Sequence, residues 1–333
     1  MISSVLLLAL GVAVLYLGAE WLIRGAVRLG TRLGVTPIMV GLTVVSIGTS
    51  APELVVSVVA SLRGTPDLAM GNVLGSNLAN VGLVLGLAAL IRPLAVAESV
   101  VRRDLPWMVA VTLVAFLLIW NLEVGRLEGM AFALVLLIYL GVLFRQWKGQ
   151  GSTGPLKLPV PGVGVPGAGG SPRGEAASST VGLQGPWWEG GRVALGIVGL
   201  VAGGQLIVAG GTDLATWLGV SELVIGLSVV AVGTSLPELA TTVVAAARKE
   251  VDLAVGNIVG SNIFNLTFVL GGTALVQPMA VAERILRVEY PAVLLISLLL
   301  VPLALHGREL GRLKGAILLA AYVGIWVWIQ SVG

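Results

Sequence analysis

The chain has no cysteine and only one histidine among its 333 residues. Without cysteine there is no disulfide framework, no thiolate nucleophile and no zinc–thiolate or iron–sulfur site. The single histidine, His306, excludes a multi-histidine metal site and the H-E-x-x-H motif of zinc proteases. We therefore expect no resident cofactor and no enzyme activity.

Charge is also scarce, because only 11% of the residues are Asp, Glu, Lys or Arg and 56% are hydrophobic. A soluble domain carries about 25% charged residues, so this chain cannot cover a water-exposed surface. The net charge is only +3, and the basic residues stand singly between apolar runs, which argues against nucleic-acid binding. The composition predicts a polytopic membrane protein surrounded by lipid, with no obligatory protein partner.

Ten segments are apolar and close to the length of about 20 residues that a membrane-spanning helix needs. They cover residues 3–23, 37–62, 67–91, 105–122, 127–145, 191–212, 221–247, 252–276, 289–306 and 311–330. The Gly-, Pro- and Ser-rich residues 146–190 are interpreted as a flexible cytoplasmic linker. The predicted organisation is an all-α membrane protein, with one five-helix repeat in residues 1–145 and another in 191–333.

An internal repeat relates the two halves. Residues 48–86 align with residues 233–271 without gaps at an offset of 185, and 22 of the 39 positions are identical. The identical positions include Gly, Asn, Ser, Pro and Glu, which chance similarity between apolar helices does not produce. Five spans per half would insert the second copy in the opposite direction, and inverted repeats of this kind are typical of secondary transporters.

The repeated sequence GTSxPE carries a glutamate into the middle of two apolar spans, at Glu53 and Glu238. A carboxylate there is costly unless it faces a polar cavity or a cation, and no Lys or Arg stands near the centre of any span. Pro52 and Pro237 each remove a backbone donor, so we expect a broken helix with free carbonyl oxygens beside each carboxylate. Hard cations such as Ca²⁺ prefer such mixtures of oxygen ligands.

Hydroxyl and amide side chains surround the glutamates in sequence. Thr49, Ser50, Thr234 and Ser235 lie in the GTSxPE motifs. The second repeated motif, GNxxGSNxxN, places Ser76 with Asn80, and Ser261 with Asn265, four residues apart on one helix face. We expect these residues to offer oxygens to the same cavity. The remaining asparagines, Asn72, Asn77, Asn257 and Asn262, are expected to hold helices together by hydrogen bonds.

These paired motifs resemble the two alpha-repeats of the calcium:cation antiporter superfamily, the sodium/calcium exchangers and their proton-coupled relatives. The resemblance covers nearly the whole chain. It implies that Glu53 and Glu238 bind the transported ion and that the hydroxyl and amide residues named above complete the site. It further implies ligand carbonyls at Ser46 and Ala231, which stand about one turn before the motif.

One position departs from the family pattern. Prokaryotic sodium/calcium exchangers generally carry Asp where this chain has Asn265, so two formal charges remain in place of three. Two charges balance one Ca²⁺ or two monovalent ions, which puts three-sodium coupling in doubt. The expected function is a Ca²⁺ antiporter of the plasma (bacterial inner) membrane that exchanges Ca²⁺ for Na⁺. A Ca²⁺/H⁺ antiporter that uses the same glutamates remains open, and a cation channel is a further alternative.

The orientation in the membrane follows from the basic residues. With the N-terminus outside, cytoplasmic segments hold 16 Lys and Arg residues and outer segments hold 4, which satisfies the positive-inside rule. Both termini should therefore lie outside. A single cysteine introduced at Gly333 is expected to react with an impermeant thiol reagent in intact cells, and the chain has no other cysteine to interfere. Labelling that requires lysis would contradict this orientation.

Overall fold

The computed structural model describes residues 2–149, 186–218 and 231–332. Most of the predicted linker and the start of the predicted span 221–247 lie outside these residues. The described part is almost entirely helical. Several helices contain a single wider π-turn, labelled η, of five residues.

The elements of the two halves follow the same order. The first half contains α1 (Ile2–Leu33), α2 (Pro37–Val40), η1 (Gly41–Val45), α3 (Ser46–Thr49), α4 (Ala51–Leu62), α5 (Pro66–Ala79), η2 (Asn80–Val84), α6 (Leu85–Ile91), β1 (Leu94–Ala95), η3 (Val100–Asp104), α7 (Leu105–Leu118), β2 (Glu123–Val124) and α8 (Arg126–Gly149). The second half contains α9 (Pro186–Trp217), α11 (Ala231–Thr234), α12 (Leu236–Ala247), α13 (Val251–Phe264), η5 (Asn265–Val269), α14 (Leu270–Val276), β3 (Met279–Ala280), η6 (Ile285–Glu289), α15 (Tyr290–Leu305), the 3-10 turn η7 (His306–Arg308), β4 (Glu309–Leu310) and α16 (Arg312–Ser331).

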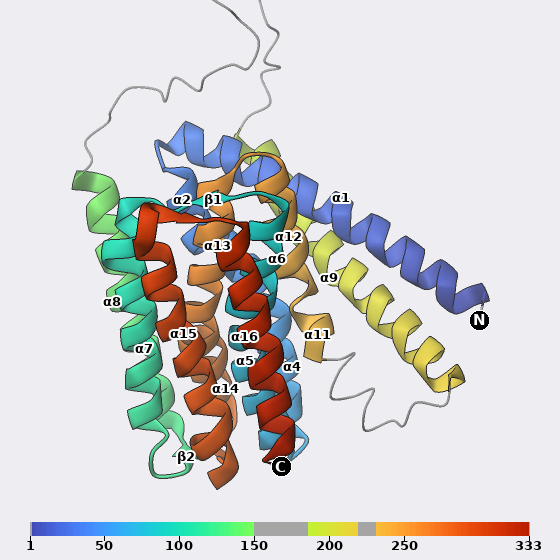
Figure 1. Ribbon diagram of the computed structural model, residues 1–333, viewed down its shortest axis with the longest axis vertical. Coiled ribbons are helices and arrows are strands. Elements are labelled where there is room, and N and C mark those ends of the chain that lie inside the picture. Colours follow the sequence, from blue (N-terminus) through green and yellow to red (C-terminus); the bar gives the residue numbers. More distant parts are fainter. Residues whose placement is uncertain (1, 150–185, 219–230, 333) are drawn as a thin grey trace, which may run out of the picture.

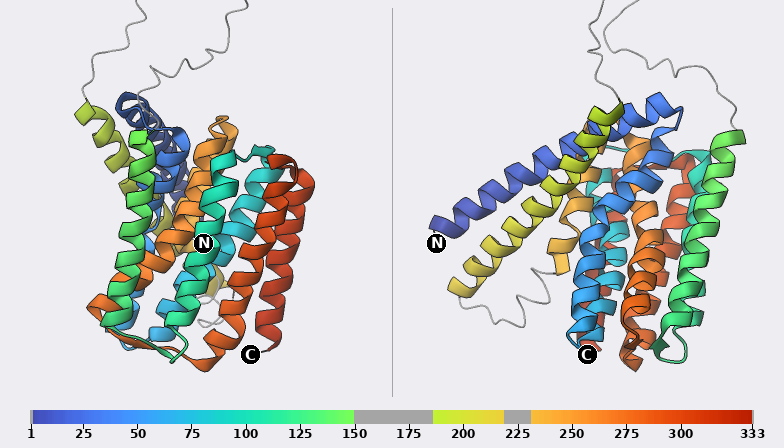
Figure 2. Two further views of the ribbon diagram at one scale, coloured as in Figure 1. Left: turned by 90° about the vertical axis from the view of Figure 1, so that its left-hand side faces the viewer. Right: turned by 180° about the vertical axis from the view of Figure 1, so that it is seen from behind.

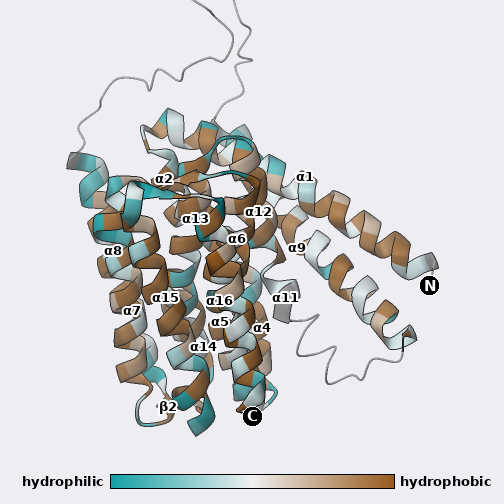
Figure 3. Ribbon diagram, viewed as in Figure 1, coloured by the Kyte–Doolittle hydropathy of each residue, from teal (hydrophilic) through white to brown (hydrophobic). Residues whose placement is uncertain are grey.

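Eight helical segments in the described part of the chain are long and apolar enough to cross a membrane. Their residues are mostly hydrophobic, and many of the hydrophilic residues lie toward the ends of the bundle (Figure 3). Two of the ten predicted spans are not among the eight. The span predicted at 105–122 is represented by the 14-residue α7, which the charged Arg102, Arg103 and Asp104 precede. Part of the span at 221–247 falls outside the described residues.

Two predicted boundaries are wrong. Helix α1 continues ten residues beyond the predicted end at residue 23, and α9 begins at Pro186, inside the predicted linker. Both extensions contain charged residues that form ion pairs. Arg28 of α1 lies 3.5 Å from the buried Glu189 of α9. Because these charges are paired across helices, the polar turns remain helical, and hydropathy alone does not mark where they end.

Helices α1 and α9 lie side by side and are tilted against the remaining bundle (Figures 1 and 2). Glycines bring the two backbones together, because a Cβ atom added at Gly18 would lie 2.6 Å from the backbone nitrogen of Leu200. A Cβ atom at Gly203 would likewise lie 2.5 Å from that of Leu15. Glu20, in the middle part of α1, pairs with Arg248, the residue that follows α12. Helices α1 and α9 are therefore joined to the rest of the bundle by an ion pair as well as by packing.

Four two-residue strands, which the sequence does not predict, connect the halves. Strand β1 pairs antiparallel with β4, and β2 pairs antiparallel with β3. The partners come from opposite halves, so each strand pair joins a loop of the first repeat to a loop of the second.

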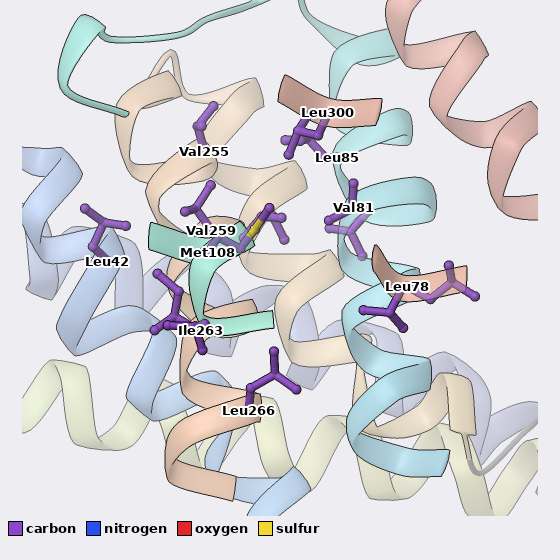
Figure 4. Packing of buried hydrophobic residues seen from close by; sticks show 14 of the residues in the cluster. Leu42, Leu78, Val81, Leu85, Met108, Val255, Val259, Ile263, Leu266 and Leu300 are labelled. Carbon is purple, nitrogen blue, oxygen red and sulfur yellow. The ribbon is translucent and has the colours of Figure 1, made fainter. Parts of the chain in front are cut away.

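The core is built from both halves. Figure 4 shows Val255, Val259 and Ile263 of α13 facing Leu42, Met108 and the side chains of α5, η2 and α6. These residues are fully or almost fully buried. Helix α13 lies at the centre of this packing. In the most hydrophobic 18-residue stretch of the segment formed by α13 and α14, 94% of the residues are buried. The polar residues of α13 are therefore carried into the interior with it.

Gly256 of α13 lies close to the backbone of Ile38. An added Cβ atom would lie 2.7 Å from the carbonyl oxygen of Ile38, which cannot move away like a flexible side chain. We expect Gly256→Ala to destabilise the protein by about 1–3 kcal/mol, as overpacking does. The measurement is thermal unfolding in detergent. Gly324→Ala is the matched control, because nothing described lies within 4 Å of it, and equal melting temperatures in both variants would contradict the packing argument.

Candidate functional site

The two glutamates occupy equivalent places at interrupted helices. Glu53 lies in the first turn of α4 and Glu238 in the first turn of α12, and both side chains are 0% exposed. Each helix is preceded by a residue that leaves helical geometry, with φ −85° and ψ 0° at Ser50 and φ −86° and ψ 2° at Ser235. The predicted break in the two helices is thus confirmed.

The proline after each break explains the local fold. Proline is well tolerated in the first turn of a helix, where its missing N–H has no intrahelical partner to lose. Pro52 and Pro237 therefore start a new helix and do not merely weaken an old one. The carboxylate then lies at the positive end of that helix, which favours an anion. The sequence interpretation stressed free carbonyls and missed this helix N-terminus.

Hydroxyl groups from both halves gather around Glu238. The Ser50 hydroxyl donates to Oε1 of Glu238 over 3.5 Å. Next to Ser50, the hydroxyl of Thr49 lies 3.3 Å from the hydroxyl of Ser261 in the other half. Asn72 donates to the backbone carbonyl oxygen of Glu53 over 3.2 Å and accepts from Thr234, so contacts between the halves also reach the first glutamate.

Further hydroxyl contacts join the two halves, and one pair of them is related by the repeat offset. Ser235 Oγ lies 3.2 Å from Ser76 Oγ, and Thr234 donates to Oδ1 of Asn72 over 3.0 Å. Thr49 has the matching contact, over 3.4 Å, with Oδ1 of Asn257. In each case a hydroxyl of one half contacts a residue of the other half.

Five buried side-chain oxygens at this place have no hydrogen-bond donor. They are both carboxylate oxygens of Glu53, Oε2 of Glu238, and Oδ1 of Asn80 and of Asn265. A buried polar atom without a partner is costly, and a buried unpaired charge is more so. Among the described residues, no Lys or Arg forms an ion pair with either glutamate. The cluster is therefore rich in acceptors and deficient in positive charge, a composition that suits a bound cation.

The remaining candidates have less direct placements. The carbonyl oxygen of Ser46 accepts the backbone N–H of Ser50 over 2.9 Å and the Thr49 hydroxyl over 3.4 Å. Its hydroxyl contacts the carbonyl oxygen of Asn257 at 3.0 Å. Ala231 is the first residue of α11, and its side chain is outside the described part of the chain.

Sequence reasoning missed two hydroxyls that support the site from behind. Asn72 donates to Ser57 Oγ over 3.0 Å, and Asn257 donates to Thr242 Oγ1 over 3.1 Å. Both bonds join neighbouring helices, as predicted for these asparagines. Ser57 and Thr242 are related by the repeat offset of 185. A hydroxyl retained at both positions was the available signal.

A cavity of about 410 Å³ lies between α4, α9, α11 and α12. Its wall is mainly apolar and includes Pro52 and Pro237, the residues next to the two glutamates, together with Thr234 and the polar Gln205. The cavity thus reaches the first turns that carry the carboxylates.

Comparison with known proteins identifies the family of the chain. The family model described as sodium/calcium exchanger protein matches residues 3–145 and 190–331. The chain is 36% identical to the putative antiporter CaxA of Alkalimonas amylolytica over 97% of this chain and 98% of that protein. It is 35% identical to the inner membrane protein YrbG of Escherichia coli over 100% and 99%.

Two proteins named as sodium/calcium exchangers give the same result. The sodium/calcium exchanger MaX1 of Methanosarcina acetivorans is 34% identical over 97% of each chain. The solved structure of the sodium–calcium exchanger NCX_Mj superimposes with a TM-score of 0.78, at 28% identity and over 97% of both chains. The chain belongs to the sodium/calcium exchanger family.

Proposed function

We propose that the chain is a secondary Ca²⁺:cation antiporter of the bacterial inner membrane, which moves Ca²⁺ by alternating access. The observation that carries the proposal is the buried group of five acceptor oxygens without donors, two carboxylates among them. A divalent cation would supply the missing positive charge, and carboxylate, amide and hydroxyl oxygens are the ligands that Ca²⁺ takes. The ligand set is Glu53 and Glu238 together with the hydroxyl, amide and carbonyl groups predicted from the two motifs.

Coupling follows from the charge of the site. An empty site would carry two buried negative charges across a low-dielectric region, at high cost. Occupation by one Ca²⁺ or by two monovalent cations cancels these charges and permits the change of access. Because only an occupied site can change access, each ion that leaves must be replaced by another. This requirement favours an antiporter over a channel.

We further propose ten membrane spans arranged as two inverted five-helix repeats, with both termini outside and the linker of residues 146–190 on the cytoplasmic side. The strand pairs support this arrangement. Strand β1, after the third predicted span, pairs with β4, after the ninth, and β2 with β3 joins the loops after the fourth and eighth. An alternating ten-span topology places the two members of each pair on the same side. The ion pair between Glu98 and Arg308 also joins loops that this topology places together.

A Ca²⁺/H⁺ antiporter is the second candidate, and the composition of the cluster gives it weight. Asn80 and Asn265 are both amides, so the described cluster holds only two carboxylates. Two carboxylates balance two monovalent ions and not three, which weakens the case for three-sodium coupling and so strengthens the case for H⁺.

One prediction tests whether the two glutamates bind the ion. Replacing Glu53 or Glu238 with Gln keeps the shape but removes one of the two charges, and Ca²⁺ binding should fall by at least about 100-fold, which corresponds to about 2.8 kcal/mol. The measurement is ⁴⁵Ca²⁺ binding to the purified protein. Glu283→Gln is the control, because that carboxylate is exposed and paired with Arg287. Normal binding in both site variants would overturn the assignment of the site.

The second prediction concerns net charge. Two site charges predict exchange of one Ca²⁺ for two monovalent ions, so reconstituted protein should carry no current under a Ca²⁺ gradient. The counter-ion is identified by imposing a Na⁺ gradient or a pH gradient separately and measuring ⁴⁵Ca²⁺ uptake. A steady current of one net charge per Ca²⁺ would contradict the two-carboxylate account, and Ca²⁺ flux without either counter-ion would indicate a channel.

A further inference from the structure

Four buried asparagines form a closed hydrogen-bond network between the two repeats. Asn77 Nδ2 donates to the carbonyl oxygen of Asn262 over 3.2 Å, and Asn262 Nδ2 donates to that of Asn77 over 3.3 Å. Asn80 Nδ2 donates to Asn262 Oδ1, and Asn265 Nδ2 donates to Asn77 Oδ1, both over 3.1 Å. All four side chains are at most 1% exposed. The bonds obey the same two-fold relation as the sequence repeat.

The network fixes which end of each amide faces the site. Asn77 and Asn262 use both the oxygen and the nitrogen of their amides on the opposite repeat. Asn80 and Asn265 use only the nitrogen, and Oδ1 of each has no donor. These two oxygens belong to the acceptor cluster, because η5 packs against α4, which carries Glu53, and η2 packs against α12, which carries Glu238.

The opposite amide orientation would destroy the site. An Asn265 turned by 180° would present two N–H donors to a region that contains acceptors and a cation. Such donors would repel the cation and could themselves satisfy the carboxylate oxygens that now lack a partner. A site satisfied internally has no need of an ion.

We propose that Asn77 and Asn262 are positioning residues, which hold Asn265 and Asn80 with their oxygens toward the ion and so maintain two neutral ligands beside two charged ones. The inference rests on the proposed cation-binding function and extends it. Partners that orient metal ligands typically contribute about 10–100-fold to metal affinity.

The network also favours an amide over an acid at position 265. A carboxylate there would place an oxygen against Asn77 Oδ1, and two acceptors would repel each other. Turning the Asn77 amide would relieve this contact but would set its Oδ1 against the carbonyl oxygen of Asn262. The network thus opposes a third charge in the site, in agreement with exchange against two monovalent ions.

The test is a pair of double-mutant cycles on the purified full-length protein, with ⁴⁵Ca²⁺ binding as the readout. Asn77→Ala is combined with Asn265→Ala, which Asn77 holds, and separately with Asn80→Ala, which Asn262 holds. We expect Asn77→Ala to lower Ca²⁺ affinity by about tenfold in the wild type and in Asn80→Ala, but to have little further effect in Asn265→Ala. A general loss of packing would lower affinity equally in both backgrounds, and this result would overturn the proposal.

A conservative variant separates positioning from helix packing. Asn77→Asp keeps the acceptor for Asn265 but removes the donor that binds the backbone of the second repeat. Positioning predicts tighter Ca²⁺ binding in Asn77→Asp than in Asn77→Ala only while Asn265 is present. The same gain in the Asn265→Ala background would be the effect of the added negative charge and would overturn the positioning role. Ser61→Ala is the control for interhelical bonds, because Ser61 donates to the carbonyl oxygen of Gln277 far along the chain, and it should bind Ca²⁺ normally.

The outcomes distinguish the two proposals. A wild-type protein that is folded by size-exclusion chromatography but binds no Ca²⁺ would overturn the proposed function and the positioning role with it. A wild type that binds Ca²⁺, with equal effects of Asn77→Ala in the two backgrounds, would overturn the positioning role alone.

Discussion

The structure depends on one electrostatic constraint, which is that two carboxylates are buried among apolar helices without a positive partner. Taking Glu53 and Glu238 out of water is expensive, and within the described residues no basic side chain compensates. The cost is reduced by two helix N-termini and a few hydroxyl donors, but several oxygens stay unpaired. A bound cation would neutralise the charge of the two carboxylates, and the requirement for a cation gives a physical basis for coupled exchange.

The surrounding fold holds the two carboxylates in positions where they have no positively charged partner. Hydroxyl and asparagine contacts cross between the repeats, so each half orients groups that belong to the other. Glycine allows the helices to approach closely enough for these short contacts, as at Gly256 against the backbone of Ile38. The amide donors of the central asparagines are all directed at one another. Each of these amide nitrogens therefore donates a hydrogen bond to the opposite repeat.

Much of this arrangement could be predicted from the repeat. Two copies of GTSxPE and GNxxGSNxxN, 185 residues apart, identified both glutamates and the asparagines, because polar identities inside apolar spans have few structural explanations. Hydropathy could not predict the ends of α1 and α9, since Arg28 and Glu189 stabilise them only after distant segments meet. The strand pairs and the Glu20–Arg248 contact are equally long-range. The direction of each asparagine amide is a further property of the assembled helices, which spacing alone does not encode.

The most direct test of the central claim is anomalous X-ray diffraction from crystals of the protein grown in Ca²⁺. The account predicts a single strong anomalous peak between the two interrupted helices, with carboxylate oxygens of both Glu53 and Glu238 at about 2.3–2.6 Å. Asn80 and Asn265 should turn their oxygens toward the peak. An ordered structure with no peak there at saturating Ca²⁺, or with Ca²⁺ bound away from both glutamates, would contradict the account.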